Sequence, residues 1–219
     1  MSLRVVRIAG LLCLPATVAA QDRFEGIVTA RMSAVGGRGG AATYAVKGDR
    51  LRMDMAGETG VVVTVLHDPS KNLNVMLMHQ QKMVLDVTSM QGAKAAAAAK
   101  KPTIKLTGKK ETIAGRECEH ALVKSDDGGQ LDVCLAKGMG AFVMGSGSAG
   151  GSNPALASTS DLLSRLGADA FPLKVTDVKT GATVFLVKTI EKKRLEDALF
   201  EIPAGYQKID MRRLGRPGL

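Results

Sequence analysis

Residues 43–55 read Thr-Tyr-Ala-Val-Lys-Gly-Asp-Arg-Leu-Arg-Met-Asp-Met, and this stretch decides the fold class. Apolar and polar side chains alternate on both sides of Gly48-Asp49, a dipeptide that suits a two-residue hairpin turn. The pattern therefore predicts two antiparallel strands, Thr43 to Lys47 and Arg50 to Met55, joined by a tight turn.

The same alternation continues along most of the chain, with turn residues between the segments. Further strands are predicted over Phe24 to Ser33, Val61 to His67, Leu73 to Met78, Lys82 to Val87, Thr103 to Thr112, Arg116 to Lys124, Gln130 to Ala136, Leu173 to Val178 and Thr183 to Lys192. Helices do not alternate with these strands, which excludes a doubly wound α/β fold. We expect a mainly β (α+β) domain built on one curved antiparallel sheet.

One segment, Pro154 to Leu166, predicts a helix. Asn153 can cap its start, and Gly167 can end it. Its apolar side chains form a single narrow stripe, so we expect the helix to dock on the concave side of the sheet by one face, either as a movable lid or as part of the core. The stripe consists of Leu156, Leu163 and Leu166.

The N-terminus has the features of a secretory signal peptide. Arg4 and Arg7 precede a short apolar run, Ile8 to Leu14, and the small residues Val18-Ala19-Ala20 follow it. The run is too short to cross a bilayer core of about 30 Å as a helix. We therefore expect cleavage near Ala20 and a periplasmic or secreted protein that is not an integral membrane protein.

Three segments follow from this: a signal peptide over 1–20, a single domain over 21–210, and a flexible tail over 211–219. Within the domain, the alanine-rich stretch 90–101 predicts a short helix or a linker. The formal net charge is +9, but basic and acidic residues are interleaved. With no tryptophan, two tyrosines and five phenylalanines, the chain has few aromatic rings for stacking bases, so nucleic-acid binding is not expected.

Two cysteines, Cys118 and Cys134, remain after removal of the signal peptide. They lie on predicted strands joined by one turn, in a compartment where disulfides form. We predict a disulfide between them. Two separate thiols are the alternative.

The sequence marks no catalytic or metal site. Its three histidines, His67, His79 and His120, have no recognisable nucleophile beside them, so we expect no enzyme activity and no cofactor. On a strand, Cys118 and His120 share one face while the flanking glutamates share the other. That division, and the use of the thiol in a disulfide, argue against a metal there.

Four methionines are the candidate ligand-binding residues of the sheet. The pairs Met53/Met55 and Met76/Met78 each have a spacing of two, which places both thioethers on one face of a strand. Methionine adapts to irregular apolar cavities, but thioethers also suit Cu(I). We expect the four methionines, with the three leucines of the predicted helix, to line an apolar site.

Five stretches carry a family resemblance over nearly the whole mature chain. These are Phe24 to Ile27, with Tyr44 to Met53 after it, then Thr107 to Cys118, Phe171 to Val175 and Leu199 to Tyr206. Together they resemble a domain of unknown function found in exported bacterial proteins. That domain is similar in turn to the lipoprotein carrier LolA and receptor LolB, which implies an unclosed half-barrel with one or two covering helices over an apolar concave face.

The sequence thus favours a non-enzymatic periplasmic protein that binds a hydrophobic ligand, a lipid or acyl chain, in a half-barrel. One alternative is a structural or regulatory envelope module that binds another protein through the sheet. A third is a copper carrier based on the methionines.

Overall fold

The computed structural model describes residues 23–33, 39–56, 62–86, 103–124, 128–140, 142 and 170–209. The proposed signal peptide, the alanine-rich stretch, the predicted helix from Pro154 to Leu166 and the tail over 211–219 lie outside these residues.

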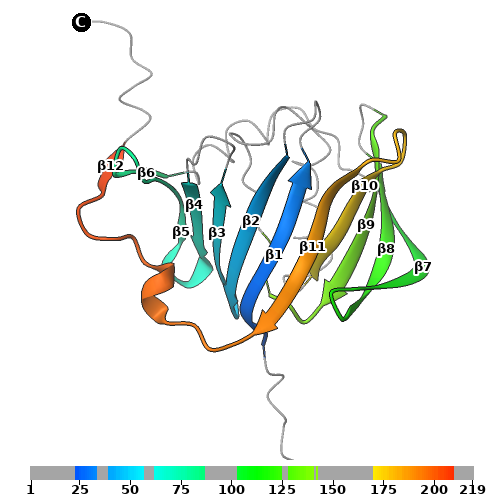
Figure 1. The fold of residues 1–219 in the computed structure, drawn as a ribbon, viewed down its shortest axis with the longest axis horizontal. Helices are drawn as coiled ribbons and strands as arrows, with labels where there is room; N and C mark the ends of the chain where they lie inside the picture. Colours follow the sequence, from blue (N-terminus) through cyan, green and yellow to red (C-terminus); the bar gives the residue numbers. More distant parts are fainter. Residues whose placement is uncertain are drawn as a thin grey trace, which may run out of the picture.

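Twelve strands of the described residues form one large, curved and unclosed sheet, in the order β12-β6-β5-β4-β3-β2-β1-β11-β10-β9-β8-β7 (Figure 1). Their bounds are β1 Glu25–Ser33, β2 Gly39–Lys47, β3 Arg50–Ala56, β4 Val62–Asp68, β5 Leu73–Met78, β6 Met83–Asp86, β7 Thr103–Ile113, β8 Arg116–Lys124, β9 Gln130–Lys137, β10 Ala170–Asp177, β11 Thr183–Lys192 and β12 Gln207–Ile209. β7 and β12 are the two edges of this sheet.

The predicted hairpin at residues 43–55 is confirmed: β2 pairs antiparallel with β3, and the turn places Gly48 at a φ of 61°. β2 begins four residues earlier than predicted, because Gly39 and Gly40 pair with the end of β1 instead of forming a loop. The expectation of a purely antiparallel sheet is wrong at one edge. There β12, which was not predicted, pairs in parallel with β6.

The sheet curves toward the face that carries Tyr44, which we call the inner face. Tyr44 on β2 and Phe171 on β10 are separated by two strands in the sheet order, yet their ring centroids lie 5.6 Å apart. Phe142 and Phe185 complete this aromatic cluster, with rings 5.5 Å and 6.2 Å from Tyr44. Side chains of this size bury much apolar area and prefer such tilted and edge-on contacts, so the cluster stabilises the curvature.

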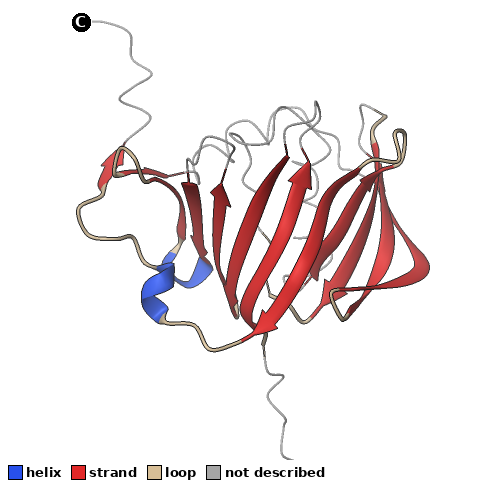
Figure 2. Ribbon diagram, in the orientation of Figure 1, coloured by secondary structure: helices blue, strands red, loops and turns tan. Residues whose placement is uncertain are grey.

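The outer face of β1–β6 is covered by residues 193–206, which we call the C-terminal strap. Leu195 and Phe200 of the strap pack with Ala45 of β2, and Ile202 and Tyr206 pack beside β4, β5 and β6. The strap contains η2 (Asp197–Phe200); with η1 (Pro69–Lys71) it supplies the helical turns of the described residues (Figure 2). The expected covering helices are therefore not confirmed. Among the described residues, no helix has the length and apolar character needed to span a membrane.

Candidate functional site

The methionines singled out from the sequence lie on the inner face of β3 and β5, on either side of β4. Strand pairing arranges them in two adjacent rows, because residues directly opposite in neighbouring strands share a face. The first row is Met53, Val65, Met76 and Leu85, and the second is Met55, Val63, Met78 and Met83. We call these eight residues the methionine patch.

The two rows differ in burial. Met53 is completely buried and Met76 is 8% exposed, so these two side chains belong to the core. In the second row, Met55, Met78 and Met83 are only half-buried. The patch therefore offers adaptable apolar surface beside a packed core. Leu156, Leu163 and Leu166, predicted to cover it, lie outside the described residues.

Tyr44 lies opposite Met53 across the β2–β3 pair, and its buried hydroxyl has no hydrogen-bond partner among the described residues. Burial raises the pKa of this phenol. A buried donor that lacks an acceptor costs about 1–3 kcal/mol, so its presence calls for an explanation. One explanation is a ligand oxygen that accepts this hydrogen bond.

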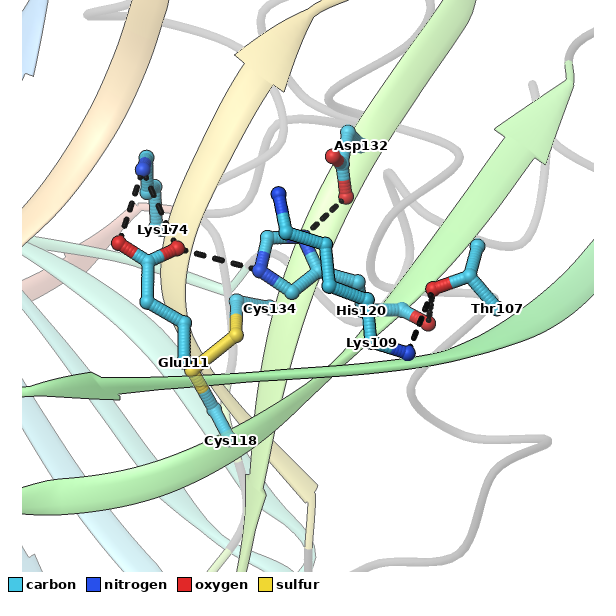
Figure 3. A network of polar contacts seen from close by, with 8 residues as sticks. All are labelled: Thr107, Lys109, Glu111, Cys118, His120, Asp132, Cys134 and Lys174. Carbon is cyan, nitrogen blue, oxygen red and sulfur yellow. Dashed lines mark hydrogen bonds and ion pairs between the residues drawn. A yellow bond between two sulfur atoms is a disulfide. The ribbon is translucent and has the colours of Figure 1, made fainter.

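The predicted disulfide is present: Cys118 on β8 and Cys134 on β9 are joined, with their Cα atoms 5.4 Å apart. A polar network lies beside it, on the same face of the strands (Figure 3). His120 is 4% exposed and is hydrogen-bonded through Nδ1 to Asp132 Oδ1 at 2.7 Å and through Nε2 to Glu111 Oε2 at 3.1 Å.

Lys174 on β10 completes this network by donating from Nζ to both oxygens of Glu111, at 3.0 and 3.2 Å. These hydrogen bonds, together with those from His120, hold the pKa of Glu111 below its usual value. The pairings β7–β8 and β8–β9 bring together Glu111, His120 and Asp132 from three consecutive strands, and the pairing β9–β10 adds Lys174, which is far away in the sequence.

A second polar network links β3–β5 to the C-terminal strap. Thr64 on β4 contacts His79 Nε2 at 2.7 Å, and His79 Nδ1 contacts the hydroxyl of Tyr206. Thr64 also donates to Asp54, which accepts hydrogen bonds from Arg52. Thr64 is completely buried. This network therefore fixes the strap to the sheet.

Sequence reasoning identified Cys118, Cys134 and the four methionines, but it missed the two polar networks. It placed His120 correctly on the face of Cys118. Glu111 lies opposite Cys118 in the β7–β8 hairpin, whereas Lys174 comes from β10 and is distant in the sequence. Met83 was also missed, although its position opposite Met78 follows from the predicted hairpin between β5 and β6.

Residues 24–206 match the family model described as domain of unknown function DUF4412. The chain belongs to the DUF4412 family. This match includes every strand from β1 to β11 and the C-terminal strap, so the DUF4412 domain comprises the whole sheet except β12. No curated protein matches the sequence significantly.

Solved structures share only a distant likeness with this DUF4412 chain. A crystal structure of MucB in complex with MucA(peri) is 13% identical, with a TM-score of 0.44 over 88% of this chain and 60% of that one. PNGF-II in space group C2 is 13% identical, with a TM-score of 0.41 over 84% of this chain and 30% of that one. PNGF-II in space group P21 is 11% identical, with a TM-score of 0.42 over 88% of this chain and 32% of that one. The chain thus spans less than two thirds of the length of each.

Proposed function

We propose that this DUF4412 protein is an exported, non-enzymatic protein that binds a hydrophobic ligand, a lipid or acyl chain, on the inner face of its sheet. The observation that carries the proposal is the row of half-buried methionines, Met55, Met78 and Met83, which continues a fully apolar core row. Flexible thioether side chains can repack around chains of different length.

Two further features support this proposal. The hydroxyl of Tyr44, which lacks a partner in the described part of the chain, lies beside the patch, and an ester or carboxylate oxygen at the head of an acyl chain would accept its hydrogen bond. The secretory-type N-terminus and the disulfide support export to an oxidising compartment, where lipids and lipoproteins are carried. The proposal keeps the apolar concave face that the resemblance to LolA and LolB implies.

Copper transport by the methionines is less favoured by the strand order. β4 lies between β3 and β5, so the pairs Met53/Met55 and Met76/Met78 stand two strand spacings apart, about 10 Å, with Val63 and Val65 between them. The two pairs therefore face the same side without adjoining each other.

A second candidate function is binding of another envelope protein. β7 supports it, because this edge strand of the described sheet is exposed along most of its length, and Leu106 on it is 54% exposed. An exposed edge can accept an extended segment of a partner as an additional strand. Lysines along β7, including Lys105 and Lys109, are also a common protection against unwanted pairing.

Lipid extraction and native mass spectrometry of the mature protein, purified from an envelope fraction, test the first proposal. We expect co-purifying lipid, and we expect delipidated protein to bind a fluorescent acyl probe. The double variant Met55→Gln/Met78→Gln should weaken probe binding about tenfold or more, because it places amide groups on the apolar surface. The exposed Val178 allows a matched control, Val178→Gln, which should bind as the parent does.

Absence of lipid and of probe binding in folded protein would contradict the proposal. Co-purification of a stoichiometric envelope protein that is lost when β7 carries Leu106→Asp would instead support the second candidate.

A further inference from the structure

Three potential metal ligands meet at the disulfide, on β7, β8 and β9. Ligand atoms of Glu111, His120 and Cys134 all lie within 4.8 Å of one another. Cys118 Sγ is bonded to Cys134 Sγ and is the fourth candidate ligand once the bond is reduced. Figure 3 shows the disulfide next to Glu111 and His120. Two sulfurs, one imidazole nitrogen and one carboxylate form a ligand set of the kind that zinc prefers.

His120 is already oriented as a metal-binding histidine is. Its Nδ1 is held by Asp132 Oδ1 at 2.7 Å, which leaves Nε2 facing Glu111. A histidine that binds a metal through one ring nitrogen usually donates a hydrogen bond from the N–H of the other to a carboxylate. This hydrogen bond fixes the tautomer and the ring orientation. The ring is buried, so its position is defined by packing as well as by hydrogen bonds.

In the disulfide form this arrangement is closed to a metal ion. Both sulfurs are used in the S–S bond, and the ammonium group of Lys174 supplies the positive charge next to Glu111. Both ring nitrogens of His120 face carboxylate oxygens, those of Asp132 and Glu111.

We propose that the reduced form of this protein binds Zn²⁺ through Cys118, Cys134, His120 and Glu111, and that the disulfide switches the site off. A dithiol reductant first converts the disulfide to two thiols and becomes a disulfide itself. Zinc then binds as each of the two thiols releases one proton to the solvent and Nε2 of His120 supplies its lone pair. The two positive charges of Zn²⁺ balance the two thiolates, and Lys174 stays beside the second oxygen of Glu111 and balances its charge.

The ligand types argue for zinc over other divalent ions. Ca²⁺ and Mg²⁺ bind oxygen ligands in six- to eight-coordinate sites, which two sulfurs and one nitrogen do not provide. Asp132 is a positioning residue in this site, since it contacts only His120 in the network. Removing such a partner typically lowers metal affinity 10–100-fold.

The test uses the full mature chain, reduced with a phosphine and then freed of it, and titrated with Zn²⁺ against a chromogenic chelator. We expect one zinc per chain in the reduced protein and none in the oxidised protein. Co²⁺ in place of zinc should give thiolate-to-cobalt charge-transfer bands and the strong visible bands of a tetrahedral site. Asp132→Asn should weaken binding 10–100-fold, and Cys118→Ser/Cys134→Ser should abolish it.

Glu117 on β8 supplies a matched control, because it is paired with Lys110 and adjacent residues of a strand point to opposite faces. Glu117→Gln should leave zinc affinity unchanged, whereas Glu111→Gln should weaken it. Equal weakening by both substitutions would overturn the proposal, as would reduced, folded protein that binds zinc no better than the oxidised form. If reduction unfolds the chain, zinc must restore the far-ultraviolet circular dichroism of the sheet. Failure to do so also overturns the proposal.

Discussion

The backbone of Gly140 lies directly against the backbone of Gly48, although the two glycines belong to opposite parts of the sheet. A Cβ atom at position 140 would stand 2.5 Å from the carbonyl oxygen of Gly48 and 2.8 Å from Cγ1 of Val46. Gly48 forms the turn between β2 and β3, whereas Gly140 follows β9, four strands away in the sheet order. This contact holds the segment that follows β9 against the turn between β2 and β3.

Gly140→Ala should therefore destabilise the domain by at least about 2 kcal/mol, because it combines a backbone clash with an unfavourable φ of +79°. Urea unfolding followed by circular dichroism measures this loss. Gly181→Ala is the matched control, since Gly181 also has a positive φ, +70°, but has open space around it. We expect a loss of about 1 kcal/mol there. Equal losses at the two positions would show that the contact with Gly48 is unimportant.

Two tyrosines differ in what their hydroxyl groups contact. The hydroxyl of Tyr206 is hydrogen-bonded to His79, whereas that of Tyr44 is buried and contacts no polar partner within the described ranges. Tyr44→Phe should leave the free energy of unfolding of ligand-free protein unchanged or raise it by about 1 kcal/mol, and Tyr206→Phe should lower it by about 1 kcal/mol. Chemical denaturation of the delipidated variants tests both. A marked loss of stability in Tyr44→Phe would mean that its hydroxyl has a partner.

The disulfide between Cys118 and Cys134 closes a loop of about 15 residues, and in the chain-entropy model it contributes roughly 3 kcal/mol. Replacing both cysteines with serine should lower the free energy of unfolding by about that amount. Intact mass after alkylation, with and without reductant, establishes whether the exported protein contains the bond. Two freely alkylated thiols in unreduced protein would contradict it.

Ion pairs tie the strap to the first strands and give stability a dependence on pH. Asp197 accepts hydrogen bonds from Lys47 and Arg50, which lower its pKa to about 2. Because an unfolded aspartate titrates near pH 3.9, this contribution is complete above about pH 4 and disappears as the pH falls toward 2.

Asp197→Asn should reduce the dependence of the thermal midpoint on pH between about 4 and 2. Added salt should weaken the effect, since Asp197 is exposed. Glu196→Gln is the control, because Glu196 is also exposed and makes no ion pair within the described residues. If the thermal midpoint of Asp197→Asn fell with pH in the same way as that of the parent does, the ion pairs of Asp197 would be excluded as the source of the pH dependence.

The local sequence pattern was sufficient to predict most of the strands of the sheet. Alternation and turn residues predicted every strand from β1 to β11, because period-2 alternation and turn preferences act between neighbours in the sequence. The disulfide was also predictable, since its cysteines lie in one hairpin. The parallel pairing of β12 was not predictable from the sequence. Its partner β6 lies more than a hundred residues earlier, and the short β12 segment has no alternating pattern of its own.

What the sequence by itself determined is the β character of the domain, its hairpins, the pairing of Cys118 with Cys134 and the shared face within each methionine pair. Only the tertiary structure decided that Lys174 joins Glu111 beside His120 and that Tyr44 meets Phe171. It also decided that Met53 is buried while Met55 is half-exposed. The physical reason is that these relationships depend on strand order and curvature. Both arise from packing between distant segments, whereas the periodicity of a strand records only which of its own residues share a face.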